Sequence, residues 1–221
     1  MFEQEHHDPL PSELQPRLSE LLVVVAIGAA HVCIELAASV EVTRIYNAAA
    51  GIGLTAYLIW RATTTNNILR VWGMRCDNLW QALRVQLIFG VPAAGCLILF
   101  GLMNGTVPLP PSFWLVCALY PLFGVAQQFV LQNLIARNLT MFVPHQVLLA
   151  FLSALLFSLS HIPRLPLSVL ALIAGFFLTL IYQRHQNLWA VGLVHGILAG
   201  LAFYIVLQQD PRARIIQFLT N

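Results

Sequence analysis

Charge is what this sequence has least of. Asp, Glu, Lys and Arg make up 9% of the 221 residues, and all eleven basic residues are arginine. A soluble globular domain carries about 25% charged residues, whereas here none of the four types occurs between Val85 and Ala136. The composition therefore excludes an ordinary soluble enzyme. Because the arginines stand singly, no basic cluster could follow a phosphate backbone, and we expect no nucleic-acid partner.

Recognisable metal-binding patterns are also missing. The four cysteines have no CxxC spacing, and we interpret them as small hydrophobic residues. No HExxH motif occurs, and the apolar segments offer only four candidate metal ligands, which are His31, Glu35, His161 and His195. We therefore expect neither a metal nor another cofactor.

Hydrophobic residues, in contrast, make up 59% of the chain and form long runs. A helical membrane span needs about 20 apolar residues. The sequence therefore predicts an all-α, polytopic integral membrane protein in contact with membrane lipid. About seven transmembrane helices are expected, at residues 21–40, 48–60, 83–103, 113–137, 145–160, 165–182 and 188–207.

The chain divides into four segments by composition. A polar N-terminal segment covers residues 1–20, and an accessory transmembrane region covers 21–111, with a polar loop at 61–81 that we expect along the membrane interface. A functional core follows at 112–208, just after three prolines, and a tail covers 209–221. Seven of the eleven arginines fall on the side of the 61–81 loop, which indicates a cytoplasmic N-terminus and an external C-terminus.

Polar side chains interrupt three of the apolar segments. His161 and His195 lie on two of them, and Gln127 and Gln128 lie together on a third, followed by Gln132. Side chains that can ionise are costly in hydrocarbon and usually face a polar cavity or a partner, although a lone histidine is often a packing group. Two histidines on spans separated by one helix favour a joint site. The amides could line the same cavity or could bridge helices through hydrogen bonds.

The order of these residues resembles the CPBP family, which contains the CAAX proteases and bacteriocin-processing enzymes, also called Abi. These intramembrane endopeptidases carry E-E-x-x-x-R on one span, F-x-x-x-H on the next and H-x-x-x-N or similar two spans later. Phe157 and His161 match the second motif, His195 begins the third, and Gln127-Gln128 with Gln132 stands in place of the first.

The resemblance covers about residues 112–208 and implies a four-helix core. It implies that His161, His195, Gln127 and Gln128 take the catalytic positions and that Gln132 and Phe157 contact substrate. The implied substrate is a membrane-embedded or prenylated peptide, and the implied location is a bacterial inner membrane.

The departures from the family pattern bear on catalysis. Glutamine replaces both glutamates, Gln132 replaces the arginine, and Ala199 stands at the last polar position. A general base must accept a proton, which an amide does not do. Glu35, four residues after His31, is the one acid deep in a span and could serve as a substitute base. It could equally pair with His31 or Arg44, and nothing in the sequence indicates that the first span contacts the core.

Three functions are compatible with this pattern. The first is an endopeptidase that acts on a membrane-associated, possibly lipidated peptide, and the second is an inactive family member that binds such a peptide or serves as a membrane adaptor. A small transporter ranks lower, because no internal repeat is visible.

The three polar site residues are expected at different depths in the membrane. With straight helices, Gln127 and His195 would lie nearer the inner face and His161 nearer the outer face. A joint site therefore requires a break near residues 137–146, where Pro144 stands.

Overall fold

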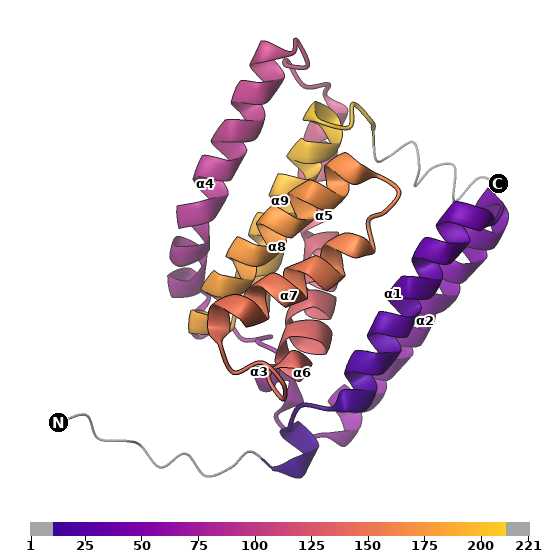
Figure 1. Ribbon diagram of the computed structural model, residues 1–221. Helices are drawn as coiled ribbons and strands as arrows, with labels where there is room; N and C mark the ends of the chain where they lie inside the picture. The colour runs from indigo at the N-terminus through magenta and orange to yellow at the C-terminus, as the bar shows by residue number, and fades with distance from the viewer. Residues whose placement is uncertain (1–10, 211–221) are drawn as a thin grey trace.

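The computed structural model describes residues 11–210, and every regular element in that part of the chain is helical. A short 3-10 turn at Ser12–Leu14 (η1) precedes α1 (Leu18–Ala37), α2 (Val40–Thr64), α3 (Ile68–Val71) and α4 (Leu79–Met103). The chain continues with α5 (Ser112–Phe129), a π-helical segment η2 (Val130–Ala136), α6 (Arg137–Leu139), α7 (Gln146–Leu159), α8 (Leu165–His185) and α9 (Leu188–Ile205). The predicted all-α fold is confirmed (Figure 1).

Five helical segments are long and apolar enough to cross a membrane: Ser12–Ala37, Leu79–Met103, Ser112–Leu139, Leu165–His185 and Leu188–Ile205. The protein is therefore a polytopic integral membrane protein, as predicted. Two of the seven expected spans are not among the five. The helix α2 has 25 residues but is less apolar, with Arg44, Asn47 and Thr55 along it. The helix α7 has only 14 residues, about 21 Å of helix against a hydrocarbon core of about 30 Å.

The helices α5 and α9 form the centre of the structure, with α4 packed on α9 and α7 packed on α8 (Figure 1). Glycines allow the close approach of α5 and α9. A Cβ atom added to Gly124 would lie 2.2 Å from the carbonyl oxygen of Gly192, and one added to Gly196 would lie 2.6 Å from the Cα of Pro121. Small residues at a helix interface let two backbones meet in this way. The sequence placed α4 in the accessory region, but in space it packs along the core.

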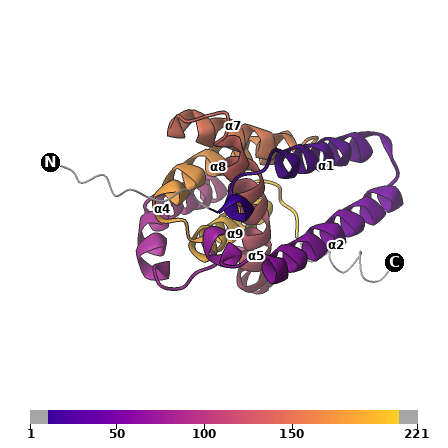
Figure 2. The ribbon, with the colours of Figure 1, turned by 90° about the horizontal axis from the view of Figure 1, so that it is seen from below.

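The hairpin of α1 and α2 stands to one side of this core in both views (Figures 1 and 2). At its lower end, in the view of Figure 1, a polar cluster around Glu20 joins α1 to α2 within the hairpin and to α6 of the core. The Tyr57 hydroxyl donates to Glu20 Oε1 over 2.5 Å, Asn138 Nδ2 donates to Oε2 over 3.0 Å, and the Arg61 guanidinium lies 3.9 Å from Oε1. The hairpin is thus attached through polar bonds together with the apolar contacts of Val24, Leu54 and Leu58, whereas α5 and α9 meet through backbone contact.

The segment between α2 and α4 differs from the expected interfacial loop. Ile68 and Trp72 are each 1% exposed, so that they are core residues and not membrane anchors. The Trp72 ring meets Phe129 edge to face, with ring centroids 4.9 Å apart, and its carbonyl accepts a hydrogen bond from Asn133 Nδ2 over 3.1 Å. Leu69, next to Ile68, is exposed, and so is Trp80 at the start of α4. The segment therefore closes one end of the core.

Candidate active site

A cavity of about 1660 Å³ lies between the α1–α2 hairpin and the core. Its walls come from α1, α2, α4, α5, η2, α7, α8 and α9 and are largely apolar. Its polar lining includes Gln127, His161 and His195 from the core side together with His31, Glu35 and Arg164. Small-molecule pockets typically measure about 300–1,000 Å³. This cavity is larger and has room for a lipid chain and a peptide together.

Gln127 and His195 form the polar pair at the α5–α9 contact. His195 Nε2 lies 2.9 Å from Gln127 Oε1, and because an amide oxygen only accepts, Nε2 is the donor and carries the proton. The lone pair then resides on Nδ1, which is buried without a hydrogen-bond partner. The glycine contacts of Gly124, Gly192 and Gly196 are what bring these two side chains within hydrogen-bonding distance.

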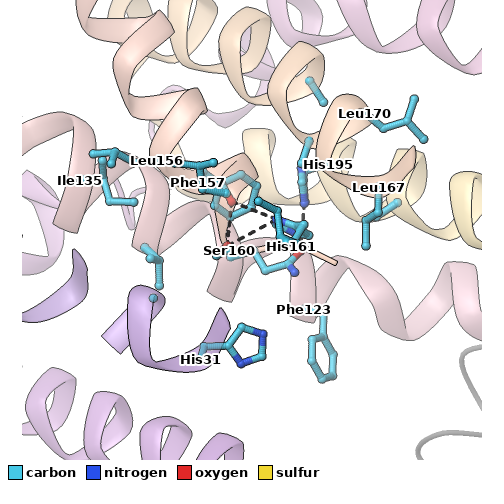
Figure 3. A pocket seen from close by; sticks show the side chains of 18 of the residues that line it. His31, Phe123, Ile135, Leu156, Phe157, Ser160, His161, Leu167, Leu170 and His195 are labelled. Atoms are coloured by element: carbon cyan, nitrogen blue, oxygen red, sulfur yellow. Dashed lines mark hydrogen bonds between the residues drawn. The ribbon is translucent and has the colours of Figure 1, made fainter. Parts of the chain in front are cut away.

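His161 lies in the turn between α7 and α8, one residue beyond Ser160 (Figure 3). Its Nδ1 lies 2.9 Å from the carbonyl oxygen of Phe157, so Nδ1–H donates and the lone pair resides on Nε2. The Phe157 ring lies between the two histidines, with centroids 4.8 Å from His161 and 6.1 Å from His195. The F-x-x-x-H spacing therefore has a local reason, because Phe157 both contacts the His161 ring and fixes its tautomer.

The structure brings His161 and His195 to the same cavity, despite the different depths that straight helices would give them. The π-helical segment Val130–Ala136, the irregular residues 140–145 and the shortness of α7 make this possible. The break lies where Pro144 indicated it. π-helical turns inside α-helices often occur at functional sites.

Gln128 and Gln132 do not line the cavity. Gln128 is fully buried, and Gln132 Nε2 donates to Gln128 Oε1 over 2.8 Å and to Thr179 Oγ1 of α8 over 3.0 Å. These two amides therefore bridge α5, η2 and α8, which is the second of the two roles considered from the sequence. Of the three glutamines, only Gln127 faces the cavity.

Glu35 does reach the core. Its Oε1 accepts a hydrogen bond from Arg164 Nη2 over 2.7 Å, and its Oε2 lies 3.1 Å from His31 Nε2. The pairing with His31 is one of the expected alternatives, whereas the arginine is Arg164 and not Arg44. Sequence reasoning missed Arg164 as a site residue, and the one signal for it was its place three residues after His161. Ala199 also lines the cavity, at the position where the family motif has a polar residue.

Within residues 11–210, no group of three or more His, Cys, Asp or Glu side chains is arranged to hold a metal ion. The polar groups of the cavity instead include His161 and His195 in fixed tautomers, the Gln127 amide and the Glu35–Arg164 ion pair. Such groups can donate and accept hydrogen bonds, and His161 Nε2 can accept a proton.

Residues 108–201 match the protein family described as Type II CAAX prenyl endopeptidase Rce1-like. Neither a curated protein nor a solved structure matches the chain. The matched segment contains Gln127, Phe157, His161 and His195 and extends from just before α5 into α9. The protein is therefore a membrane protein of the CAAX protease type, and its residues 108–201 are similar to the Rce1-like family.

Proposed function

We propose that this protein binds a membrane-embedded, prenylated peptide in the cavity between the α1–α2 hairpin and the core. One observation carries the proposal: a single cavity of about 1660 Å³ combines apolar walls with the Gln127–His195 pair and His161. The walls suit an isoprenoid chain, and the polar groups suit the peptide bonds attached to it. The matched family, whose description names prenyl endopeptidases, supports the same class of ligand.

Cleavage of that peptide is a second candidate function, and the orientation of His161 favours it. The Phe157 carbonyl holds Nδ1–H and leaves the Nε2 lone pair free to take a proton from water. The hydroxide would attack the peptide carbonyl, and the His195 Nε2–H, which donates to Gln127 Oε1 in the empty cavity, would turn to donate to the developing oxyanion. His161 would then return its proton to the leaving amine. Gln127 can orient the carbonyl or the water through its amide but has no basicity.

The residue changes at the first motif favour binding without cleavage. Gln127 occupies the position at which the family resemblance implies a proton-accepting glutamate, and the substitute candidate Glu35 is already bonded to Arg164. We therefore rank binding above hydrolysis, and an adaptor role would rest on binding alone.

Reconstitution into liposomes with a farnesylated tetrapeptide tests both functions at once. Binding is measured by equilibrium titration and cleavage by mass spectrometry, for wild type and for His161→Ala and Gln127→Glu. Gln146→Glu serves as the matched control, because Gln146 is exposed at the start of α7 and does not line the cavity.

We expect wild type to bind the peptide. Cleavage by wild type that disappears in His161→Ala would establish the peptidase. Cleavage only in Gln127→Glu, and not in Gln146→Glu, would mark a peptidase fold retained for binding. Absence of binding by wild type would contradict the proposal.

We also propose a bacterial inner membrane as the location, with α3 on the cytoplasmic side. The location rests on the family resemblance, and the orientation rests on the arginines. Arg61, Arg137 and Arg184 fall near the ends of α2, η2 and α8, at the same end of the structure as α3 (Figure 1). Alkaline phosphatase fused after residue 210 should be active, and inactivity of that fusion would reverse the orientation.

A further inference from the structure

Arg164 stands out among the described residues that line the cavity, because it is the only arginine there. It lies on the same turn as His161, and its backbone N–H donates to the His161 carbonyl over 3.0 Å. Its side chain is 36% exposed, so its guanidinium remains accessible. A cation within a membrane protein is costly and usually marks a path or a site for a charged ligand.

Arg164 holds a carboxylate in the structure. Glu35 Oε1 accepts from Arg164 Nη2 over 2.7 Å, in a pair whose carboxylate side chain is 20% exposed. The pair is only part-buried, so another carboxylate can reach Arg164 and replace Glu35. Glu35 would keep a partner after such an exchange, because His31 Nε2 lies 3.1 Å from its other oxygen.

Building on the proposed function, we propose that Arg164 receives the terminal carboxylate of the bound peptide, and that Glu35 occupies Arg164 when the cavity is empty. The planar guanidinium matches a carboxylate in a two-bond geometry. Arg164 is also the N-cap residue of α8, and the partial positive charge of a helix N-terminus further favours an anion there.

The chemistry of the ligand supports this assignment. In a C-a-a-X sequence the prenylated cysteine is followed by only three residues, so that the terminal carboxylate must enter the cavity together with the prenyl chain. Glu20, the other acidic residue of the lining, is held at the far end of the hairpin by Tyr57 and Asn138. With the carboxylate on Arg164, the peptide bonds before it would lie near His161, three residues away in the chain.

A comparison of two ligands on unaltered protein tests the inference. Farnesylated tetrapeptide is prepared as the free acid and as the C-terminal carboxamide, which has the same shape without the charge. Binding to the full chain in nanodiscs is measured by titration. We expect the acid to bind about tenfold more tightly than the amide, because hydrogen bonds to charged groups are the stronger kind.

Three variants locate the effect. Arg164→Gln should bind acid and amide equally, at the affinity that wild type has for the amide. Glu35→Gln should bind the acid up to about fivefold more tightly than wild type, because the competing carboxylate is gone, with no change for the amide. The control Arg44→Gln removes an arginine of α2 that does not line the cavity and should behave as wild type.

The possible failures are distinguishable. Equal binding of acid and amide by wild type, or a preference that survives in Arg164→Gln, overturns the assignment of Arg164 and leaves the proposed function standing. Binding of neither form overturns the proposed function and this inference together.

Discussion

The α5–α9 pair and the α1–α2 hairpin both contain glycines, but only those of the α5–α9 pair lie in a close helix contact. In the pair, a Cβ atom on Gly124 or Gly192 would meet backbone or side-chain atoms of the partner helix at 2.2–2.4 Å. In the hairpin, a Cβ atom on Gly28, Gly51 or Gly53 would have nothing within 4 Å. The pair therefore requires glycine, whereas the hairpin does not. The Gln127–His195 pair is carried by helices in backbone contact, whereas the opposite wall of the cavity is held by a few polar bonds and a few apolar side chains.

The largest effect is expected from a side chain inserted into the close contact. Gly124→Val would drive its methyl groups into the backbone of α9 and should lower the free energy of unfolding by about 3 kcal/mol or more, at the upper end for overpacked cores. The matched variant Gly51→Val enters open space in α2 and should change stability by well under 1 kcal/mol. Thermal unfolding in detergent micelles measures both. Similar losses in the two variants would refute the contrast between the pair and the hairpin.

A smaller and local effect is expected at the lower attachment of the hairpin. Glu20→Gln removes the charge that accepts hydrogen bonds from Tyr57 and Asn138, a loss of about 2 kcal/mol for bonds to a charged group. Hydrogen–deuterium exchange should quicken in α1 and α2 and stay unchanged in α9. Glu41→Gln, on an exposed residue of α2, is the control. Faster exchange in α9 as well would show that the hairpin and the core unfold together.

The same contrast explains how far the sequence could predict the structure. Long apolar runs predicted helices such as Leu165–His185 and Leu188–Ile205 to within a few residues, because hydrophobic length decides a membrane helix. The order of the motifs predicted that His161 and His195 share a site, and in the structure both line one cavity. These features depend on local sequence and on the family resemblance.

The remaining features depend on how one helix is rotated or placed against another. Gln127 and Gln128 are both polar and only about 100° apart around the helix, so the sequence could not show that Gln127 faces the cavity and that Gln128 is buried against Gln132. The Glu35–Arg164 bond joins residues far apart in the chain, across a hairpin attached mainly at its other end. Trp72 belongs to the 61–81 loop that was expected along the membrane interface, but its packing on Phe129 required the fold.

The smallest effect is expected from a buried amide that the cavity does not touch. Gln132→Met keeps the length of the side chain but removes its bonds to Gln128 and Thr179. Hydrogen bonds between membrane helices are worth about 0.6 kcal/mol each on average, so the loss of stability should be about 1 kcal/mol.

The affinity of Gln132→Met for a farnesylated peptide should equal that of wild type. Gln127→Met, in contrast, leaves the His195 Nε2–H without its partner inside the cavity and should weaken binding of the same peptide. Titration of Gln132→Met and Gln127→Met with the same peptide measures both affinities. If Gln132→Met weakened binding as much as Gln127→Met, the cavity would not mark the site, and the face of η2 that meets α8 would have to be considered instead.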